Sequence, residues 1–227
     1  MKRVTSNESR VAPPDLWTVV PVRGIANGKS RLAVALQAAA RARLNRHLLE
    51  RTLTVIDSWR GDLARCVVVS PCAETLEVAA RRGAVAVPEV AGESGLNGAA
   101  ALGASYARDN GAGAVLILPC DLPYLKPESL AAVVRAADTA GHMVIAPDRA
   151  GTGTNALLVN AQRPFEFRFG ERSFARHLSL AAERGWTAAI LSLPELAFDL
   201  DTPEDLAGWP GAAEAALACS SGDIVRI

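Results

Sequence analysis

Short apolar runs alternate along this chain with longer stretches in which apolar residues recur at helical spacing. These runs are short and apolar, and the first of them is β-branched and bounded by Pro21 and Gly24, which predicts buried strands. We predict these strands at residues 17–22, 66–69, 84–87, 115–118, 143–146, 156–159 and 188–193. We predict helices at residues 34–59, 74–82, 99–109, from Pro127, at 173–184 and from Thr202, with a glycine-bearing loop at 92–98.

This alternation predicts the fold class and the place of the chemistry. Strands separated by covering helices form a mostly parallel, mixed sheet that is buried on both faces, which is a three-layer α/β/α domain. We predict a single domain over residues 16–210, between a polar leader at 1–15 and a tail at 211–227. Because such sheets bind ligands at the carboxyl ends of their strands, the loops after 17–22 and 115–118 and the segment around Asp199 are where we expect the site.

Composition and charge exclude several classes of protein. Half of the 227 residues are hydrophobic, which is enough for a sizeable core and argues against a disordered chain. The 24 basic residues balance the 24 acidic residues, so no nucleic-acid-binding surface is indicated, although a local site for a small anion stays open. The longest apolar runs are far below the roughly 20 residues of a membrane span, and the leader lacks the apolar stretch of a secretory signal. We therefore expect a cytoplasmic protein without a membrane partner.

The loop after the first predicted strand, residues 23–31, combines two glycines with three cations just before a helix. Glycine lets backbone N–H groups approach an anion, the helix N-terminus adds partial positive charge, and Lys29 and Arg31 supply full charges. This favours a phosphate site, with a solvated basic turn as the alternative. Residues 28–30 match the end of the P-loop pattern, but Arg23 stands where that pattern requires glycine.

Three aspartates follow predicted strands or lie in extended segments. Asp121 comes directly after an apolar strand, between two prolines. Asp199 and Asp201 are two residues apart, so an extended backbone would turn both carboxylates to one face. Carboxylates without cysteine or histidine partners favour Mg²⁺ and its bound phosphates. The alternative for Asp201 is a role at the start of a helix, where Thr202 would be the N-cap and Pro203 the first helical residue.

A third cluster could bind a second phosphate. Ser173 precedes a helical pattern, Gly170 gives close access to the backbone, and Thr154 adds a hydroxyl donor. The alternative is that Ser173 is an ordinary N-cap. The three histidines are scattered along the chain, and we expect each of them to be structural; they are His47, His142 and His177.

Taken as a set, these motifs resemble the 2-phospho-L-lactate guanylyltransferases of coenzyme F-420 biosynthesis. The resemblance spans residues 17–206 and keeps the order and spacing of the family's motifs, although Arg23 replaces a lysine of that family. The motifs are Val20-Pro21-Val22-Arg23, Lys29-Ser30-Arg31-Leu32, Gly95-Leu96-Asn97, the segment 118–123, Ala146-Pro147-Asp148-Arg149, the segment 153–157, Phe169-Gly170, Ser173-Phe174 with His177, and the segment 199–206.

The resemblance implies a nucleotidyltransferase fold of the GT-A type and transfer of GMP from GTP to a small phosphorylated carboxylic acid, with release of pyrophosphate. The acceptor would be 2-phospho-L-lactate, phosphoenolpyruvate or 3-phosphoglycerate. The implied metal ligands are Asp121, Asp199 and Asp201, and the implied acceptor-phosphate contacts are Thr154, Gly170 and Ser173. We assign catalysis to Lys29, Arg31 and Asp121, and nucleotide binding to Pro21, Arg23, Gly28, Lys29 and Asn97.

Two other functions stay open at this stage. Another GT-A-type nucleotidyltransferase, acting on a sugar phosphate, a molybdopterin or an isoprenoid precursor, would share the first loop and the aspartates. A noncatalytic nucleotide-binding module on the same fold would bind GTP without turnover. The oligomeric state also stays open, with a homodimer among the options.

Overall fold

The computed structural model describes residues 15–26, 28–89, 95–140 and 142–212. Within them one seven-stranded sheet has the order β3-β2-β1-β4-β6-β5-β7, in which β6 alone is antiparallel to its neighbours. This confirms the predicted mostly parallel, mixed sheet. The strands are β1 (Leu16–Pro21), β2 (Cys66–Ser70), β3 (Val85–Pro88), β4 (Ala114–Ile117), β5 (Met143–Pro147), β6 (Thr154–Asn160) and β7 (Ala188–Ile190).

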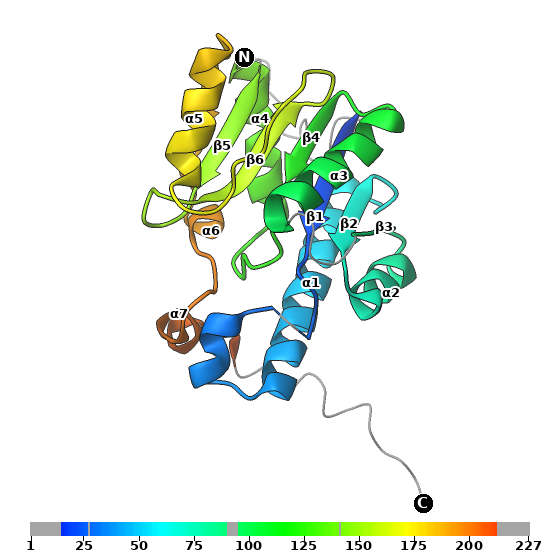
Figure 1. Cartoon of the computed structure of the whole chain (residues 1–227), viewed down its shortest axis with the longest axis vertical. Coiled ribbons are helices and arrows are strands. Elements are labelled where there is room, and N and C mark those ends of the chain that lie inside the picture. The colour runs from blue at the N-terminus through cyan, green and yellow to red at the C-terminus, as the bar shows by residue number, and fades with distance from the viewer. Residues whose placement is uncertain (1–14, 27, 90–94, 141, 213–227) are drawn as a thin grey trace, which may run out of the picture.

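Helices cover both faces of the sheet, as the alternating pattern predicts. Helices α1 and α4 pack on one face, and α3 and α5 pack on the other (Figure 1). The helical elements are η1 (a 3-10 helix, Ser30–Val34), α1 (Ala38–Arg60), α2 (Ala73–Arg81), α3 (Gly95–Asp109), α4 (Pro127–Ala140), α5 (Ser173–Glu183), α6 (Pro194–Ala197) and α7 (Pro203–Gly208).

Three predicted boundaries are wrong. The helix predicted at 34–59 begins only at Ala38, because Val34 ends the separate 3-10 helix η1 and the chain turns at residues 35–37 between the two. Helix α3 begins at Gly95, inside the loop predicted at 92–98, and the strand predicted at 188–193 ends at 190. The remainder of that strand leads into the short helix α6, which the periodicity does not reveal.

The core explains why the strands read as continuous apolar runs. All residues of β2 are buried, and successive side chains pack into different clusters: Val68 lies on the α1 side, whereas Val67 and Val69 lie on the α3 side. A Cβ at Gly103 of α3 would lie 2.4 Å from a methyl group of Val19, so glycine lets this helix lie directly on β1. Helix α3 is thereby held beside the carboxyl end of β1.

The chain order of the strands creates a crevice. Strand β1 lies between β2 and β4 and is parallel to both; the connection leaving β1 runs to β2, toward one edge of the sheet, and the connection leaving β4 runs to β5, toward the other edge. Loops at such a switch point separate and leave a binding crevice at the carboxyl ends of the strands. A third apolar cluster, built on Leu32, Leu48, Leu200 and Trp209, holds the C-terminal segment against η1 and α1 beside this crevice.

The predicted leader at 1–15 and tail at 211–227 lie outside the described residues, except for residue 15 and residues 211–212. Within the part of the chain that is described, the helices lack the length and apolarity of a membrane span.

Candidate active site

Two glycines allow the loop after β1 to fold tightly against its neighbours. Gly24 has a φ of +119°, and a Cβ there would lie 2.9 Å from Cβ of Cys72. A Cβ at Gly28 would lie 2.7 Å from Nδ2 of Asn45, a residue of α1 whose amide donates to the carbonyl oxygen of Ile25 at 2.8 Å. The loop therefore needs glycine at both positions in order to pack against these side chains, and the approach of its backbone N–H groups to an anion stays a prediction.

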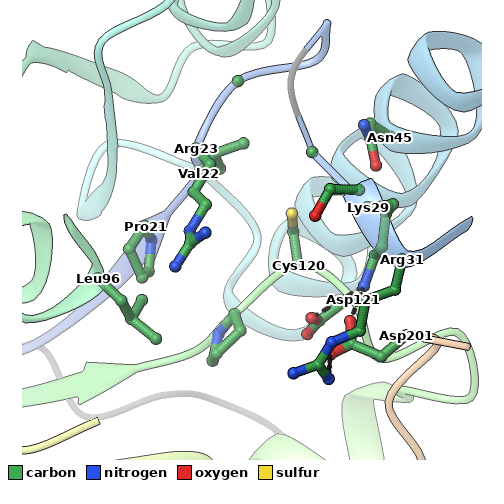
Figure 2. Close-up of a pocket in the computed structure, with 14 residues that line it drawn as sticks. Pro21, Val22, Arg23, Lys29, Arg31, Asn45, Leu96, Cys120, Asp121 and Asp201 are labelled. Carbon is green, nitrogen blue, oxygen red and sulfur yellow. Dashed lines mark hydrogen bonds and ion pairs between the residues drawn. The ribbon is translucent and has the colours of Figure 1, made fainter. Parts of the chain in front are cut away.

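Lys29 has an unusual backbone conformation that directs its side chain into the site. Its φ of 57° and ψ of 44° lie in the left-handed region, which a lysine adopts rarely and at a cost of about 1 kcal/mol or more. Its Nζ atom lies 3.0 Å from Oδ2 of Asp121 and 2.9 Å from Oδ1 of Asp201 (Figure 2). Residues from three distant parts of the chain thus meet around one ammonium group.

Burial alone would lower the pKa of Lys29, whose side chain is 8% exposed, but the charges of Asp121 and Asp201 outweigh burial and raise it. Lys29 is therefore fully charged at neutral pH. Arg31, which is largely exposed, lies at the edge of the cluster, with Nη1 3.6 Å from Oδ2 of Asp201. The loop supplies one enclosed cation and one accessible cation, and both can make charge-assisted hydrogen bonds to an anion.

Asp199 lies in the same electrostatic neighbourhood. Burial raises its pKa, and the charges of Asp121 and Asp201 raise it further. The Nδ2 group of Asn155, at the start of β6, lies 3.4 Å from Oδ1 of Asp199 and also donates to the carbonyl oxygen of Leu196 at 2.9 Å. Asp199 therefore lies within reach of the charges of the other two aspartates, and their convergence around one metal ion stays a prediction.

The three aspartates fit Mg²⁺ in their chemistry. Among the described residues, however, no group of three or more aspartate, glutamate, histidine or cysteine side chains is arranged so that it could hold a metal ion. The ammonium of Lys29 lies between the carboxylates of Asp121 and Asp201 instead. All three aspartates offer the oxygen donors that Mg²⁺ prefers, and a divalent cation would relieve the repulsion that raises the pKa of Asp199. Binding the metal at all three requires Lys29 to move, and the Mg²⁺ site stays a prediction.

A short extended segment positions Asp199 and Asp201. The side chain of Leu200 between them is fully buried, and its backbone N–H donates to the carbonyl oxygen of Asp121 at 3.0 Å. Thr202 is the N-cap of α7, and Pro203 lies in its first turn, as predicted. The carboxylate of Asp205 completes the cap, so the carboxylate of Asp201 is free to face Lys29.

Asp205 is a residue that our sequence interpretation missed. It accepts hydrogen bonds from the backbone N–H of Thr202 at 2.8 Å and of Asp201 at 3.1 Å, and from Nη2 of Arg149 at 2.6 Å. Burial works against its ionisation, but these hydrogen bonds lower its pKa to about 2. The pattern Thr-Pro-Glu-Asp at 202–205 is close to a capping box and could have revealed it.

We expect Asp205→Ala to lower the free energy of unfolding by about 2 kcal/mol, because it removes the helix cap and the charged partner of Arg149. The folded-state pKa lies below the ordinary value of 3.8, so this contribution is present above pH 3.8 and is lost as the pH falls towards 2. Urea unfolding at pH 7 and pH 3 measures both effects. The exposed neighbour in Glu204→Ala is the control, and equal losses in the two variants would contradict the prediction.

The predicted acceptor-phosphate residues also come together, around His177. The hydroxyl groups of Ser173 and Thr154 lie 3.1 Å apart, and Nδ1 of the fully buried His177 lies 3.2 Å from Oγ1 of Thr154. Nε2 of His177 accepts the backbone N–H of Arg168 at 2.9 Å. Burial, with the charges of Arg176 and Arg168, lowers the pKa of His177 to about 4, so the ring is neutral and donates from Nδ1 to Thr154.

One detail of the predicted cluster is wrong. Ser173 is the first residue of α5 and is buried, whereas Arg172, with a φ of 54°, occupies the N-cap position. Gly170 has a φ of +105° and lies in open space, consistent with backbone access. The first two residues of β6 face opposite ways: Thr154 contacts His177, whereas Asn155 contacts Asp199. The start of β6 therefore links the acceptor cluster to the aspartates.

The neutral state of His177 predicts how stability depends on pH. The unfolded ring binds a proton near pH 6.5, and the folded ring does so only near pH 4, so stability falls as the pH drops through this window. We expect this group to account for about 3 kcal/mol of that loss. Urea unfolding of the wild type and of His177→Asn between pH 7 and pH 4 measures it. The dependence of the free energy of unfolding on pH should weaken in His177→Asn and persist in the control His142→Asn. An unchanged dependence in His177→Asn would refute the assignment.

Asn97 lies in the first turn of α3, not in a loop. Its Oδ1 atom accepts the backbone N–H of Phe169 at 2.6 Å, and its Nδ2 group donates to the carbonyl oxygen of Phe169 at 3.2 Å. Asn97 therefore ties α3 to the loop that contains Gly170. Its predicted contact with the nucleotide stays a prediction.

A cavity of about 400 Å³ opens beside the lysine and the aspartates (Figure 2). Seven of the predicted site residues line it, namely Pro21, Arg23, Gly28, Lys29, Arg31, Asp121 and Asp201. Asn97, Asp199, Thr154, Gly170 and Ser173 are not among its lining residues. The lining residues that the sequence interpretation missed include Asn45, a buried polar residue of α1, and Leu96 and Cys120, which carry no polar signal.

Comparison with known sequences gives consistent relatives. Residues 16–209 match the family model described as guanylyl transferase CofC like. A phosphoenolpyruvate guanylyltransferase of Rubrobacter xylanophilus is 42% identical over 193 residues, which cover 85% of this chain and 92% of that protein. A 3-phospho-D-glycerate guanylyltransferase of Phenylobacterium zucineum is 35% identical over 189 residues, which cover 82% of this chain and 86% of that protein.

Comparison with solved structures supports the fold. A putative nucleotide-diphospho-sugar transferase of Desulfovibrio desulfuricans superimposes with a TM-score of 0.68 and 15% identity, covering 91% of both chains. A nucleotidyl transferase of Methanothermobacter superimposes with a TM-score of 0.60 and 17% identity, covering 86% of this chain and 96% of that one. The sheet is thus of the kind found in nucleotidyltransferases.

Proposed function

Because the chain belongs to the guanylyl transferase CofC-like family, we propose that it transfers GMP from GTP to the phosphate of a small phosphorylated carboxylic acid. The observation that carries this proposal is the meeting of Lys29 with Asp121 and Asp201 beside a cavity at the carboxyl ends of β1 and β4. We further propose that pyrophosphate is released and that the product serves coenzyme F-420 biosynthesis, as the family resemblance implies.

Phosphoenolpyruvate is the acceptor we propose first. Relatives that are 42% and 41% identical to this chain over most of its length carry the name phosphoenolpyruvate guanylyltransferase. A more distant relative, at 35% identity, is named for 3-phospho-D-glycerate. All of these acceptors are three-carbon acids that carry one phosphate and one carboxylate, so the same cluster of donors could bind the phosphate of each of them.

The nucleotide would bind with its phosphates against the first loop. Lys29 and Arg31 would bind the triphosphate, and the tight turns at Gly24 and Gly28 would let backbone N–H groups approach it. As this occurs, the ammonium of Lys29 would leave the carboxylates of Asp121 and Asp201 for the phosphate oxygens. Asp121, Asp199 and Asp201 would then hold Mg²⁺, which when bound supplies positive charge that stabilises the leaving pyrophosphate.

The acceptor would need positioning rather than activation. A phosphate monoester has a second pKa near 6, so it is largely a dianion at neutral pH and needs no general base. One of its oxygens attacks the α-phosphorus of GTP, a new P–O bond forms, and the bond from that phosphorus to the β-phosphate oxygen breaks. Thr154, Gly170 and Ser173 would hold the acceptor phosphate, and the neutral His177 would orient the hydroxyl of Thr154.

The experiment that tests this proposal incubates the purified protein with Mg²⁺, each of the four nucleoside triphosphates and each of the three acceptors. We expect a guanylylated acid by mass spectrometry and an equal amount of pyrophosphate, with GTP and phosphoenolpyruvate as the preferred pair. Orthophosphate released from the γ position would indicate a phosphohydrolase. GTP binding without any product would indicate a noncatalytic module, and either result would refute the proposal.

A further inference from the structure

A second cavity continues from the first one, on the side away from the aspartates. It has a volume of about 490 Å³ and shares Pro21, Val22, Arg23 and Leu96 with the first cavity. Its remaining lining residues come from the ends of β2 and β3 and from the first turns of α3. The two cavities together form one site with two chambers, and Arg23 lies at their junction.

The chemistry of the second chamber differs from that of the first. Its walls are mostly apolar, with Pro21, Pro71 and Leu96 among them, and its one acidic lining residue is Glu89. The first chamber instead contains Lys29, Arg31 and the two aspartates. An apolar chamber with a single carboxylate suits a planar heterocycle, whereas the cationic chamber suits phosphates. A bound nucleoside triphosphate would therefore place its base in the second chamber.

The position of Glu89 is fixed by the sheet. Its backbone N–H donates to the carbonyl oxygen of Ser70 at 3.0 Å, which extends the pairing of β3 with β2 by one residue beyond Pro88. Ser70 is fully buried, so this hydrogen bond lies on a rigid part of the sheet. Glu89 itself is half-buried. Glu89 therefore extends from an ordered strand end and lines the second chamber, and a rigid support of this kind is what a residue that discriminates between ligands needs.

We propose that Glu89 selects guanine, which rests on the proposed function of this site in binding GTP. Guanine carries two adjacent donors, N1–H and the N2 amino group, and one carboxylate can accept both. Adenine and cytosine present a ring nitrogen acceptor next to an amino donor, so the same carboxylate would meet a lone pair. Arg23, at the junction, would face the ribose or the phosphates.

A structural role for Glu89 makes a different prediction. Strand β3 lies at the edge of the sheet, and charged residues near edge strands commonly prevent pairing with other chains. Such a charge would be needed for solubility and would not distinguish one base from another. Discrimination between GTP and ITP, which lacks only the 2-amino group, separates the two roles.

The test measures the binding of GTP and ITP by calorimetry, together with kcat/KM for both in guanylyl transfer. We expect the wild type to prefer GTP by roughly 10- to 100-fold, the effect of one hydrogen bond to a charged group. Glu89→Gln and Glu89→Ala should reduce this preference to less than about threefold, mainly by weakening the binding of GTP. Glu77→Gln, on the exposed face of α2, is the matched control and should keep the preference.

Each outcome decides the inference. An unchanged preference in both Glu89 variants, or a wild type that binds GTP and ITP equally, overturns it. If the wild type binds GTP more tightly than ITP but transfers no guanylyl group, the proposed reaction is refuted. The Glu89 variants would then still test the contact with the base through binding alone. A wild type that binds neither nucleotide would overturn both proposals.

Discussion

Replacing Asp199 by asparagine is expected to lower kcat/KM for guanylyl transfer by about 10³-fold or more while leaving the protein folded. Asparagine keeps the shape of the side chain but removes one of the three charges that would hold Mg²⁺. Asp121→Asn and Asp121→Ala should have losses of the same order, since Asp121 is proposed to hold the same metal and its charge acts on Asp199.

The stability of the Asp199 variant should move in the opposite direction. Burial and the charges of Asp121 and Asp201 raise the pKa of Asp199, so its ionisation disfavours the folded state at neutral pH. A neutral amide avoids that repulsion and can still accept the hydrogen bond from Asn155. We therefore expect a melting temperature equal to or above that of the wild type, as for residues kept for function at a cost in stability.

Pyrophosphate release and a thermal melt, each measured with and without Mg²⁺ and GTP, check both parts. The wild type should gain stability from Mg²⁺ and GTP together, and Asp199→Asn should gain much less. Asp138→Asn, an exposed change on α4, is the control and should behave as the wild type. Full activity of purified Asp199→Asn would refute the metal assignment.

The sequence predicts the elements of this fold best where burial is complete. Strand β2 is apolar on both sides because helices cover both faces, so its pattern could be recognised without any knowledge of its neighbours. Strand β7 lies at the sheet edge with exposed ends, and its pattern does not distinguish strand from the turn that follows. Helix α3 begins among glycines that favour a loop, and its start is set by tertiary contacts, such as those of Asn97 with Phe169.

The same distinction applies to the candidate site. Lys29 and Asp121 could be found because the residues around them carry the evidence, a glycine-rich loop and a strand end between prolines. Asn45, Asn155 and Arg149 act on residues 20, 44 and 56 positions away in the chain, respectively. Nothing in their local sequence indicates these partners, because the contacts exist only once the sheet order is set.

The second large effect is expected for Lys29→Met, which keeps the length of the side chain and removes its charge. We expect kcat/KM to fall by about 10³-fold, since the buried ammonium would otherwise bind the phosphates of GTP. We also expect Mg²⁺ to bind more tightly to the variant when no nucleotide is present. The ammonium lies 3.0 Å from Asp121 and 2.9 Å from Asp201, where it competes with a divalent cation for the same oxygens.

Removing that ammonium leaves two carboxylates without their counter-charge. Their side chains are 28% and 37% exposed, so water screens part of the repulsion, and we expect a loss of about 1 kcal/mol in the free energy of unfolding. Added Mg²⁺ should restore this loss in Lys29→Met. Calorimetric titration with Mg²⁺ and urea unfolding with and without the metal measure the two effects.

Lys126→Met is the matched control, because Lys126 also pairs with a carboxylate, that of Glu195 at 3.2 Å, but on the surface. It should change neither Mg²⁺ affinity nor transfer. If Lys29 only stabilised the loop, Lys29→Met would weaken Mg²⁺ binding along with the fold, and Lys29→Arg would restore activity fully. Tighter Mg²⁺ binding combined with lost transfer is the result expected of a lysine that exchanges between carboxylates and phosphates. In this proposal the ammonium leaves Asp121 and Asp201 when the nucleotide and its metal bind, so its removal favours the metal and weakens the binding of the phosphates.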